Sequence, residues 1–106
     1  MSKSNEQFDL MDILDFTVEK EYHEGGNECQ QKLGELNFDE VFEGYRLFFY
    51  RVECENKTPS VYYKCCSNHW GLSTRSKHET LEEMCEMYNY WINGRRNGRL
   101  HNFPSI

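Results

Sequence analysis

Six apolar side chains near the C-terminus recur at the spacing of an α-helix, and this pattern constrains the fold more than any other. They are Leu81, Met84, Cys85, Tyr88, Trp91 and Ile92. At 100° per residue they form one stripe about 120° wide, and polar residues occupy the opposite side. The pattern predicts a helix over residues 77–93 that packs one side against a core.

Capping signals stand at both ends of this helix. Ser76 and Thr80 are each followed three residues later by a glutamate, Glu79 and Glu83, which is the spacing of a capping box. Gly94 is the expected stop, because glycine readily adopts the left-handed conformation that ends many helices. The helix is therefore expected to begin after one of the two caps and to end at Gly94.

Two segments rich in aromatic and β-branched residues precede the helix, at residues 45–54 and 61–66. The polar residues 55–60 separate them and contain a proline, so the pair is typical of a β-hairpin with a longer loop. Residues 70–75 are expected to add a further short strand. These segments predict an antiparallel sheet next to the helix.

The N-terminal half has a more varied pattern. Residues 8–18 favour an amphipathic helix, because apolar and acidic side chains fall on opposite arcs. The apolar arc holds Leu10, Met11, Ile13, Leu14 and Val18. Residues 16–24 alternate like a strand, residues 25–27 form a turn, and residues 28–36 return as a second strand. Residues 38–42 are expected to form a short helical turn.

These elements define the expected fold class. A chain of 106 residues has the size of one domain. We predict a single α+β domain over residues 1–106, with an antiparallel sheet, a packed C-terminal helix and an N-terminal acidic amphipathic helix. Residues 1–7 and 100–106 are expected to be flexible ends.

Charge is divided unevenly along the chain. Residues 1–43 contain twelve acidic and three basic residues, and residues 44–106 contain six acidic and nine basic residues. The net charge is therefore −9 in the first segment and +3 in the second. Carboxylates gathered on one side of a small domain attract a basic partner and repel nucleic acid.

We predict that the partner-binding carboxylates lie on the N-terminal helix and on the turn after it. They are Asp9, Asp12, Asp15, Glu19, Glu21, Glu24 and Glu28. On a helix the first four would rise at intervals of roughly 4.5–6 Å, which is similar to the spacing of phosphates along one strand. Such a row can occupy the basic groove of a nucleic-acid-handling protein. An ordinary solvated helix face produces the same pattern.

A zinc site is one chemical alternative. Its ligands would come from Cys54, Cys65, Cys66, His69 and His78. A loop over residues 55–60 places Cys54 opposite Val61 and Cys65 opposite Tyr50. The two thiols are then roughly 13 Å apart along the sheet at about 3.3 Å per residue, too far apart for one zinc ion. We therefore predict no metal and no cofactor.

Catalysis by a thiol is a second alternative, because five cysteines and four histidines are present. No catalytic-cysteine signature, phosphate-binding loop, GxSxG or HExxH motif occurs in the sequence. We predict that the chain is not an enzyme and has no catalytic residues. The cysteines are expected to be reduced thiols, most of them buried.

Nucleic-acid binding is the alternative function. Arg46 and Arg51 flank aromatic residues in the 45–54 strand, and such a surface can stack bases. A basic turn over residues 95–99 supplies further cations, at Arg95, Arg96 and Arg99. The acidic net charge opposes this function, because neutralisation of phosphates provides most non-specific affinity. The pattern also departs from the RNA-recognition consensus.

In size and net charge the chain resembles the small acidic inhibitors that phages carry against host defences, such as anti-CRISPR proteins. The resemblance is one of character and rests on no shared motif. The sequence has no signal peptide and no apolar run of about 20 residues, so a cytoplasmic protein without a membrane partner is expected. The expected function is that of a non-enzymatic inhibitor of a basic, nucleic-acid-handling protein.

Overall fold

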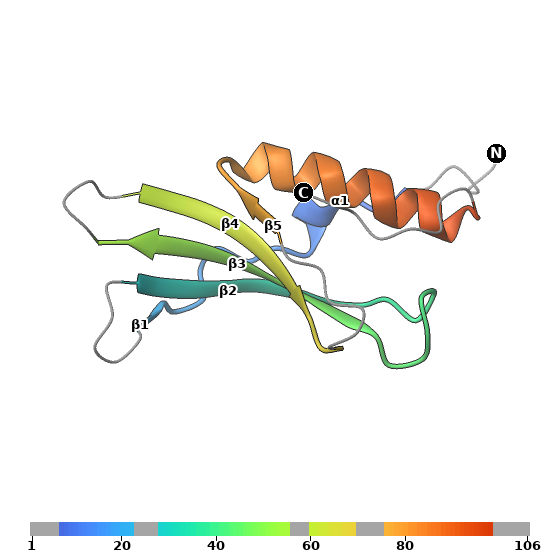
Figure 1. Ribbon diagram of the computed structural model, residues 1–106, viewed down its shortest axis with the longest axis horizontal. Coiled ribbons are helices and arrows are strands. Elements are labelled where there is room, and N and C mark those ends of the chain that lie inside the picture. Colours follow the sequence, from blue (N-terminus) through green and yellow to red (C-terminus); the bar gives the residue numbers. More distant parts are fainter. Residues whose placement is uncertain (1–6, 23–27, 56–59, 70–75, 99–106) are drawn as a thin grey trace.

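The computed structural model describes residues 7–22, 28–55, 60–69 and 76–98. Its strands form one antiparallel sheet in chain order: β1 (Glu21–Tyr22), β2 (Glu28–Asn37), β3 (Arg46–Cys54), β4 (Ser60–Ser67) and β5 (Ser76–His78). Helix α1 (Leu81–Arg96) follows β5, and the short 3-10 turn η2 (Leu10–Asp12) precedes β1 (Figure 1). The predicted α+β class, with an antiparallel sheet and a C-terminal helix, is confirmed.

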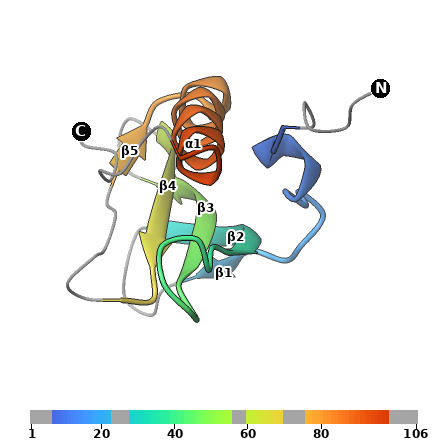
Figure 2. The same ribbon diagram turned by 90° about the vertical axis from the view of Figure 1, so that its right-hand side faces the viewer.

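The sheet has two unlike faces. Helix α1 lies over one of them, which we call the helix face, and the opposite side is the open face (Figure 2). The ring of Phe49 in β3 meets the ring of Tyr88 in α1 at a centroid distance of 5.5 Å. Because side chains alternate along a strand, the neighbours of Phe49 point to the open face. The open-face residues of β3 are Arg46, Phe48, Tyr50, Val52 and Cys54.

The core lies between the helix face and α1. Its most buried members include Phe38, Tyr45, Leu47, Phe49, Cys65, Met84, Tyr88, Trp91 and Ile92. Trp91 meets Phe38 edge to face, with ring centroids 5.1 Å apart. Every member of the predicted helical stripe is buried or packs against this core, so the predicted packing of α1 is confirmed.

The ends of α1 differ from the prediction by a few residues. The Thr80 hydroxyl accepts a hydrogen bond from the Glu83 N–H at 3.1 Å, so the second capping signal marks the start. Ser76 belongs to β5 instead. The helix continues through the buried Gly94, so the predicted stop is wrong. Gly98, with a φ of 75°, follows the helix and donates its N–H to a carbonyl of the last turn at 3.1 Å.

The prediction of an N-terminal acidic helix is wrong. Between residues 8 and 18 the only helical turn is η2. The backbone N–H of Phe8 donates to the side-chain oxygen of Asn93, and that of Leu10 donates to Asn89, each at 2.7 Å. These two bonds fix the start of the segment against α1. The Asp15 N–H, which a helix over residues 8–18 would use internally, instead donates to the Leu33 carbonyl of β2.

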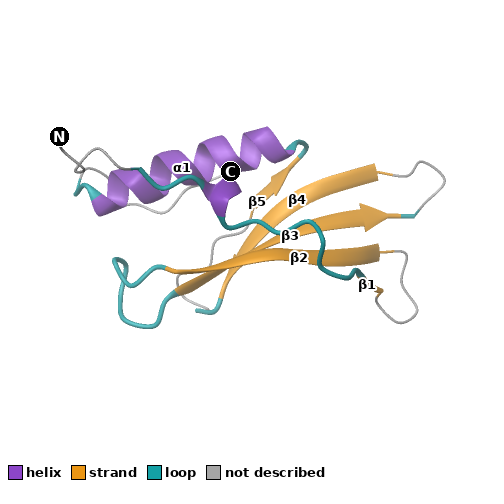
Figure 3. Cartoon of the chain, turned by 180° about the vertical axis from the view of Figure 1, so that it is seen from behind, coloured by secondary structure: helices purple, strands orange, loops and turns teal. Residues whose placement is uncertain are grey.

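The rest of the N-terminal segment runs along the sheet toward β1 (Figure 3). The Asp15 N–H donates to the Leu33 carbonyl of β2 at 2.8 Å. Of the predicted strand over residues 16–24, the structure describes residues 16–22, and only the two residues of β1 pair with β2; the residues before them lie against β2 without joining its ladder. Strand β2 occupies the range expected for the second strand, with one register shift between Lys32 and Gly34.

The β3–β4 hairpin is confirmed, but its register differs from the prediction by one residue. Cys54 pairs with Ser60, and Cys65 pairs with Phe49. Strand β4 begins at Ser60, so the connection is one residue shorter than expected. A shift of one residue moves every side chain to the other face. Cys65 consequently lies on the helix face, where it is buried.

Several expectations fall on other parts of the chain. The predicted strand over residues 70–75, the turn over residues 25–27 and the carboxylate of Glu24 lie outside the described residues. The predicted flexible ends, residues 1–7 and 100–106, also lie outside the described residues, except for residue 7. Residues 38–42 form hydrogen-bonded turns instead of a helix. Within the described ranges, α1 is too short and too polar to cross a bilayer.

Candidate partner-binding surface

The structure divides the predicted carboxylates between the two sides of the molecule. Asp9, Asp12, Asp15 and Glu19 are exposed on the N-terminal segment. Glu21 pairs with Gln30, and Glu28 pairs with Cys54, so both belong to the open face of the sheet. The predicted set therefore does not form one row, and its members do not rise at the regular intervals of a helix, because only Leu10–Asp12 forms a helical turn.

Two of these carboxylates hold local turns. Asp9 caps η2 and accepts a hydrogen bond from the Met11 N–H at 3.1 Å. Asp15 accepts hydrogen bonds from the Thr17 hydroxyl at 2.6 Å and from its N–H at 2.9 Å. These bonds, the hydroxyl first, hold the pKa of Asp15 below its ordinary value, so it stays charged at neutral pH. Short aspartate side chains favour such turns over helix interiors.

Helix α1 also contributes carboxylates, from the polar side that the sequence pattern placed opposite the apolar stripe. Glu82, Glu86, Asn89 and Asn93 share one side of the helix at i, i+4, i+7 and i+11 spacing. The two asparagines hold the N-terminal segment, which brings Asp9 beside the two glutamates. The sequence signal for this contact is the stripe of four polar residues, because the amide side chains of its two asparagines can hydrogen-bond a neighbouring backbone.

A shallow groove of about 360 Å³ separates η2 from the first turns of α1. It is lined by Asp9, Met11, Leu81, Glu82, Cys85, Glu86 and Asn89. The side chains of Met11, Leu81 and Cys85 are apolar, and carboxylates surround them. We define the acidic layer as the exposed carboxylates of this side: Asp9, Asp12, Asp15, Glu19, Glu82 and Glu86.

Exposed apolar side chains accompany the acidic layer. The large hydrophobic residues exposed in the described part of the chain are Met11 at 47%, Phe16 at 41% and Tyr90 at 72%. Met11 and Phe16 belong to the N-terminal segment, and Tyr90 lies on the outer side of α1, four residues after Glu86. Large anchors next to charged residues are typical of protein interfaces.

Cys85 lies in the groove with properties opposite to those of a nucleophile. Burial, followed by the charges of Asp9 and Glu82, raises its pKa to about 11. The thiolate is the reactive form of cysteine, so this thiol is inert at neutral pH. Cys85 therefore offers the groove an apolar contact and not a reactive thiol.

Alkylation tests this conclusion. With a pKa of about 11, only about one Cys85 thiol in a thousand is ionised at pH 8. We expect iodoacetamide at pH 8 to modify Cys85 much more slowly than Cys54 and Cys66, which are partly exposed. Peptide mapping by mass spectrometry after timed quenching measures each rate. Equal rates at the three positions would contradict the raised pKa.

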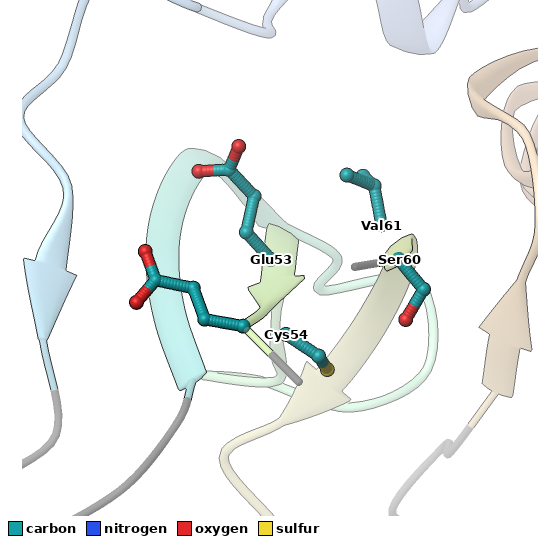
Figure 4. A pocket seen from close by; sticks show the side chains of 5 residues that line it. Glu53, Cys54, Ser60 and Val61 are labelled. Carbon is teal, nitrogen blue, oxygen red and sulfur yellow. The ribbon is translucent and has the colours of Figure 1, made fainter. Parts of the chain in front are cut away.

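A second hollow lies at the end of the β3–β4 hairpin and is lined by Glu53, Cys54, Glu55, Ser60 and Val61 (Figure 4). Glu53 pairs with Val61, and Cys54 pairs with Ser60, so the two pairs point to opposite faces. Glu53 accepts a hydrogen bond from the Lys20 ammonium at 2.9 Å, which lowers the pKa of its carboxyl. The thiol and this carboxylate therefore do not converge on one point.

The proposed zinc ligands are dispersed over the fold. Cys54 and Cys66 belong to the open face, whereas Cys65 is buried on the helix face. His78 is buried and meets Tyr88 edge to face, and His69 meets Phe42. Among the residues that the structure describes, no three His, Cys, Asp or Glu side chains are placed to hold a metal ion.

The arginines of the alternative function are also dispersed. Arg46 is on the open face, where a guanidinium nitrogen lies 3.5 Å from a carboxylate oxygen of Glu35. Arg51 is on the helix face, where the corresponding distance to Glu53 is 3.3 Å. Arg96 ends α1 and pairs with Glu40 at 3.0 Å, and Arg99 lies outside the described residues. These arginines do not form one surface.

Compared with protein-family models, with curated proteins and with solved structures, the chain matches none of them.

Proposed function

We propose that this protein is a non-enzymatic inhibitor that places its acidic layer in the basic groove of a nucleic-acid-handling protein. The observation that supports this proposal is the joint position of carboxylates and apolar anchors. Met11 lines the groove beside Asp9, Glu82 and Glu86, and Phe16 and Tyr90 are exposed on the two segments that carry the acidic layer, the N-terminal segment and α1. Methionine and aromatic side chains are enriched at protein interfaces, so exposed residues of these types beside carboxylates support a protein partner.

The mechanism has an electrostatic step and a packing step. The net charge of −6 and the local carboxylates steer the chain to a positively charged surface and raise the association rate. Burial of Met11 and Tyr90 then slows dissociation, since a few central anchors provide most binding energy. The proposal assigns no catalytic residue, cofactor or metal, and it places the protein in the cytoplasm with its partner, as for the phage inhibitors it resembles in charge and size.

A charge-reversal experiment tests the acidic layer with a synthetic arginine-rich peptide as the probe. The variant carries Asp9→Lys, Asp12→Lys, Glu82→Lys and Glu86→Lys. We expect its association rate at 50 mM salt to fall at least about tenfold below that of the wild type. At 500 mM salt the difference should nearly vanish, because the charges are screened. Stopped-flow fluorescence measures both rates. Wild-type protein should also reduce binding of the peptide to a labelled DNA duplex.

The matched control reverses four exposed glutamates elsewhere: Glu21→Lys, Glu28→Lys, Glu43→Lys and Glu55→Lys. It changes the net charge by the same amount, so the effect of net charge alone is common to both variants. We expect the control to bind several times faster than the acidic-layer variant. Equal rates would mean that net charge alone attracts the peptide, and the proposed surface would then be wrong.

A further inference from the structure

The open face of the sheet carries a row of cations that crosses four strands. The register places Lys32 opposite Tyr50, Tyr50 opposite Lys64, and Lys64 opposite Lys77. No described element covers this face, since α1 and the N-terminal segment both lie on the other side (Figure 2). The row therefore gathers three lysines on one face of the sheet, while the described carboxylates of that face, Glu21, Glu28 and Glu35, lie on β1 and β2, away from Lys64 and Lys77 on β4 and β5.

Three aromatic rings lie among these lysines. The ammonium of Lys32 is 4.9 Å from the ring centre of Phe48, and that of Lys64 is 5.4 Å from the ring centre of Tyr50. The ammonium of Lys77 is 4.9 Å from the ring centre of Tyr62. All three rings are partly exposed. Each of the three rings thus has a lysine ammonium over one of its faces.

The charge arrangement indicates an anionic ligand. Like charges directly opposite each other on neighbouring strands destabilise a sheet, and Lys64 and Lys77 are such a pair. Lys32 pairs with Glu35 at 3.0 Å, but neither Lys64 nor Lys77 makes an ion pair within the described ranges. The rings offset part of this repulsion by cation–π attraction. An anion placed over the two lysines would offset it fully.

The aromatic rings beside the lysines indicate which kind of anion binds this face. Phe48 and Tyr50 are two residues apart on one strand, or about 6.6 Å, and Tyr62 lies on the neighbouring strand. Sheets that present two or three such rings stack unpaired bases, while nearby cations bind the phosphates. A duplex keeps its bases stacked inside and does not offer them to a flat surface. An acidic peptide would bind the lysines but would leave the rings unused.

We propose that the open face binds single-stranded nucleic acid without base specificity, through stacking on Phe48, Tyr50 and Tyr62 and phosphate contacts to Lys64 and Lys77. This site is separate from the acidic layer, on the opposite side of the sheet. It differs from the arginine-based site expected from the sequence, because its cations come from β4 and β5. The two surfaces together suit a partner that is itself carrying a single strand.

Fluorescence anisotropy with labelled twelve-residue oligo-dT and oligo-U tests the proposal on the full chain at 25 mM salt. We expect micromolar binding that weakens with salt at a slope of about −1.4 in log–log form for two phosphate contacts. The substitutions Lys64→Glu and Lys77→Glu together should weaken binding at least about tenfold. Tyr50→Leu and Tyr62→Leu, which keep the face apolar, should each weaken it by about fivefold or more. A difference between the two oligonucleotides would tell DNA from RNA.

The matched control is Lys20→Glu with Arg96→Glu, which makes the same charge change away from the open face. We expect it to weaken binding less than about threefold, because distant charges are largely screened. Circular dichroism checks that every variant is folded. The acidic-layer variant should bind the oligonucleotide at least as well as the wild type, which separates this test from that of the proposed inhibitor.

Four results would overturn the proposal. The first two are no binding of the oligonucleotide at 100 μM protein and equal binding of a duplex of the same length. The other two are an equal loss of affinity in the control variant and a dimer of the wild-type protein that becomes a monomer when Lys64→Glu and Lys77→Glu are introduced. The last result would assign the open face to a second copy of the chain. Analytical ultracentrifugation of the same samples measures it.

Discussion

Replacing Trp91 with alanine is expected to lower the free energy of unfolding by about 3–5 kcal/mol, the largest effect that we expect from one substitution. Trp91 is 3% exposed and lies where α1 meets the turns before β3. Its ring meets Phe38 at 5.1 Å and Tyr88 at 6.3 Å, both edge to face. Truncation would leave a cavity between these rings in addition to the lost burial. Urea unfolding followed by circular dichroism measures the change.

The neighbouring residue provides the control. Tyr90 is 72% exposed, so Tyr90→Ala should change the free energy of unfolding by no more than about 0.5 kcal/mol. Both substitutions remove an aromatic ring from the same helix, so a difference between them reports burial and not helix propensity. An unchanged unfolding midpoint for Trp91→Ala would mean that α1 is rotated relative to the packing described above.

Gly34→Ala is expected to lower the free energy of unfolding by about 1–3 kcal/mol through a clash. A Cβ at Gly34 would stand 2.8 Å from the Ile13 carbonyl oxygen and 3.3 Å from Leu14 Cδ2. The nearest atom is backbone, so the N-terminal segment has to move away from β2. Without this contact, alanine would instead stabilise the chain by about 0.4–1 kcal/mol by restricting the unfolded state.

Hydrogen exchange distinguishes the clash from a general loss of stability. The Asp15 N–H donates to the Leu33 carbonyl next to Gly34, so its protection should fall more than that of β3 amides. The control is Glu35→Ala on the same strand, whose exposed side chain makes only surface ion pairs. We expect it to stay within about 1 kcal/mol of the wild type. A stabilised Gly34→Ala protein would contradict the close approach of the two segments.

The acidic residues show that their distribution along the sequence differs from their distribution in the fold. A division of charge along the chain was evident, but the structure divides charge by layer. Glu82 and Glu86, from the second half of the sequence, join Asp9 at the groove. Glu21 and Glu28, from the first half, lie on the open face. The order of residues along the chain could not reveal this, because the side-chain oxygens of Asn89 and Asn93 hold the segment around Phe8 and Leu10 against α1.

The sequence by itself determined the elements whose signals are local. The stripe from Leu81 to Ile92 predicted α1 and its buried side, and the aromatic segments around residues 45–54 predicted the hairpin. For α1 the period of the pattern matches the period of the backbone, so its buried side follows from spacing alone. The hairpin strands are apolar on both faces, so their sequence predicted the strands but not which face is buried. The capping signal at Thr80 was present as well, although a second candidate stood beside it.

Only the tertiary structure decided the N-terminal segment and the register of the strands. Residues 8–18 have the composition of a helix, but the Asp15 N–H donates to β2 where a helix would pair it internally, and the bonds of Phe8 and Leu10 fix the start of the segment on α1. The hairpin register depends on a single residue of loop length, and that residue decides which face each cysteine occupies. The lysine row exists only because the register aligns residues from separate strands, and no local pattern contains that alignment.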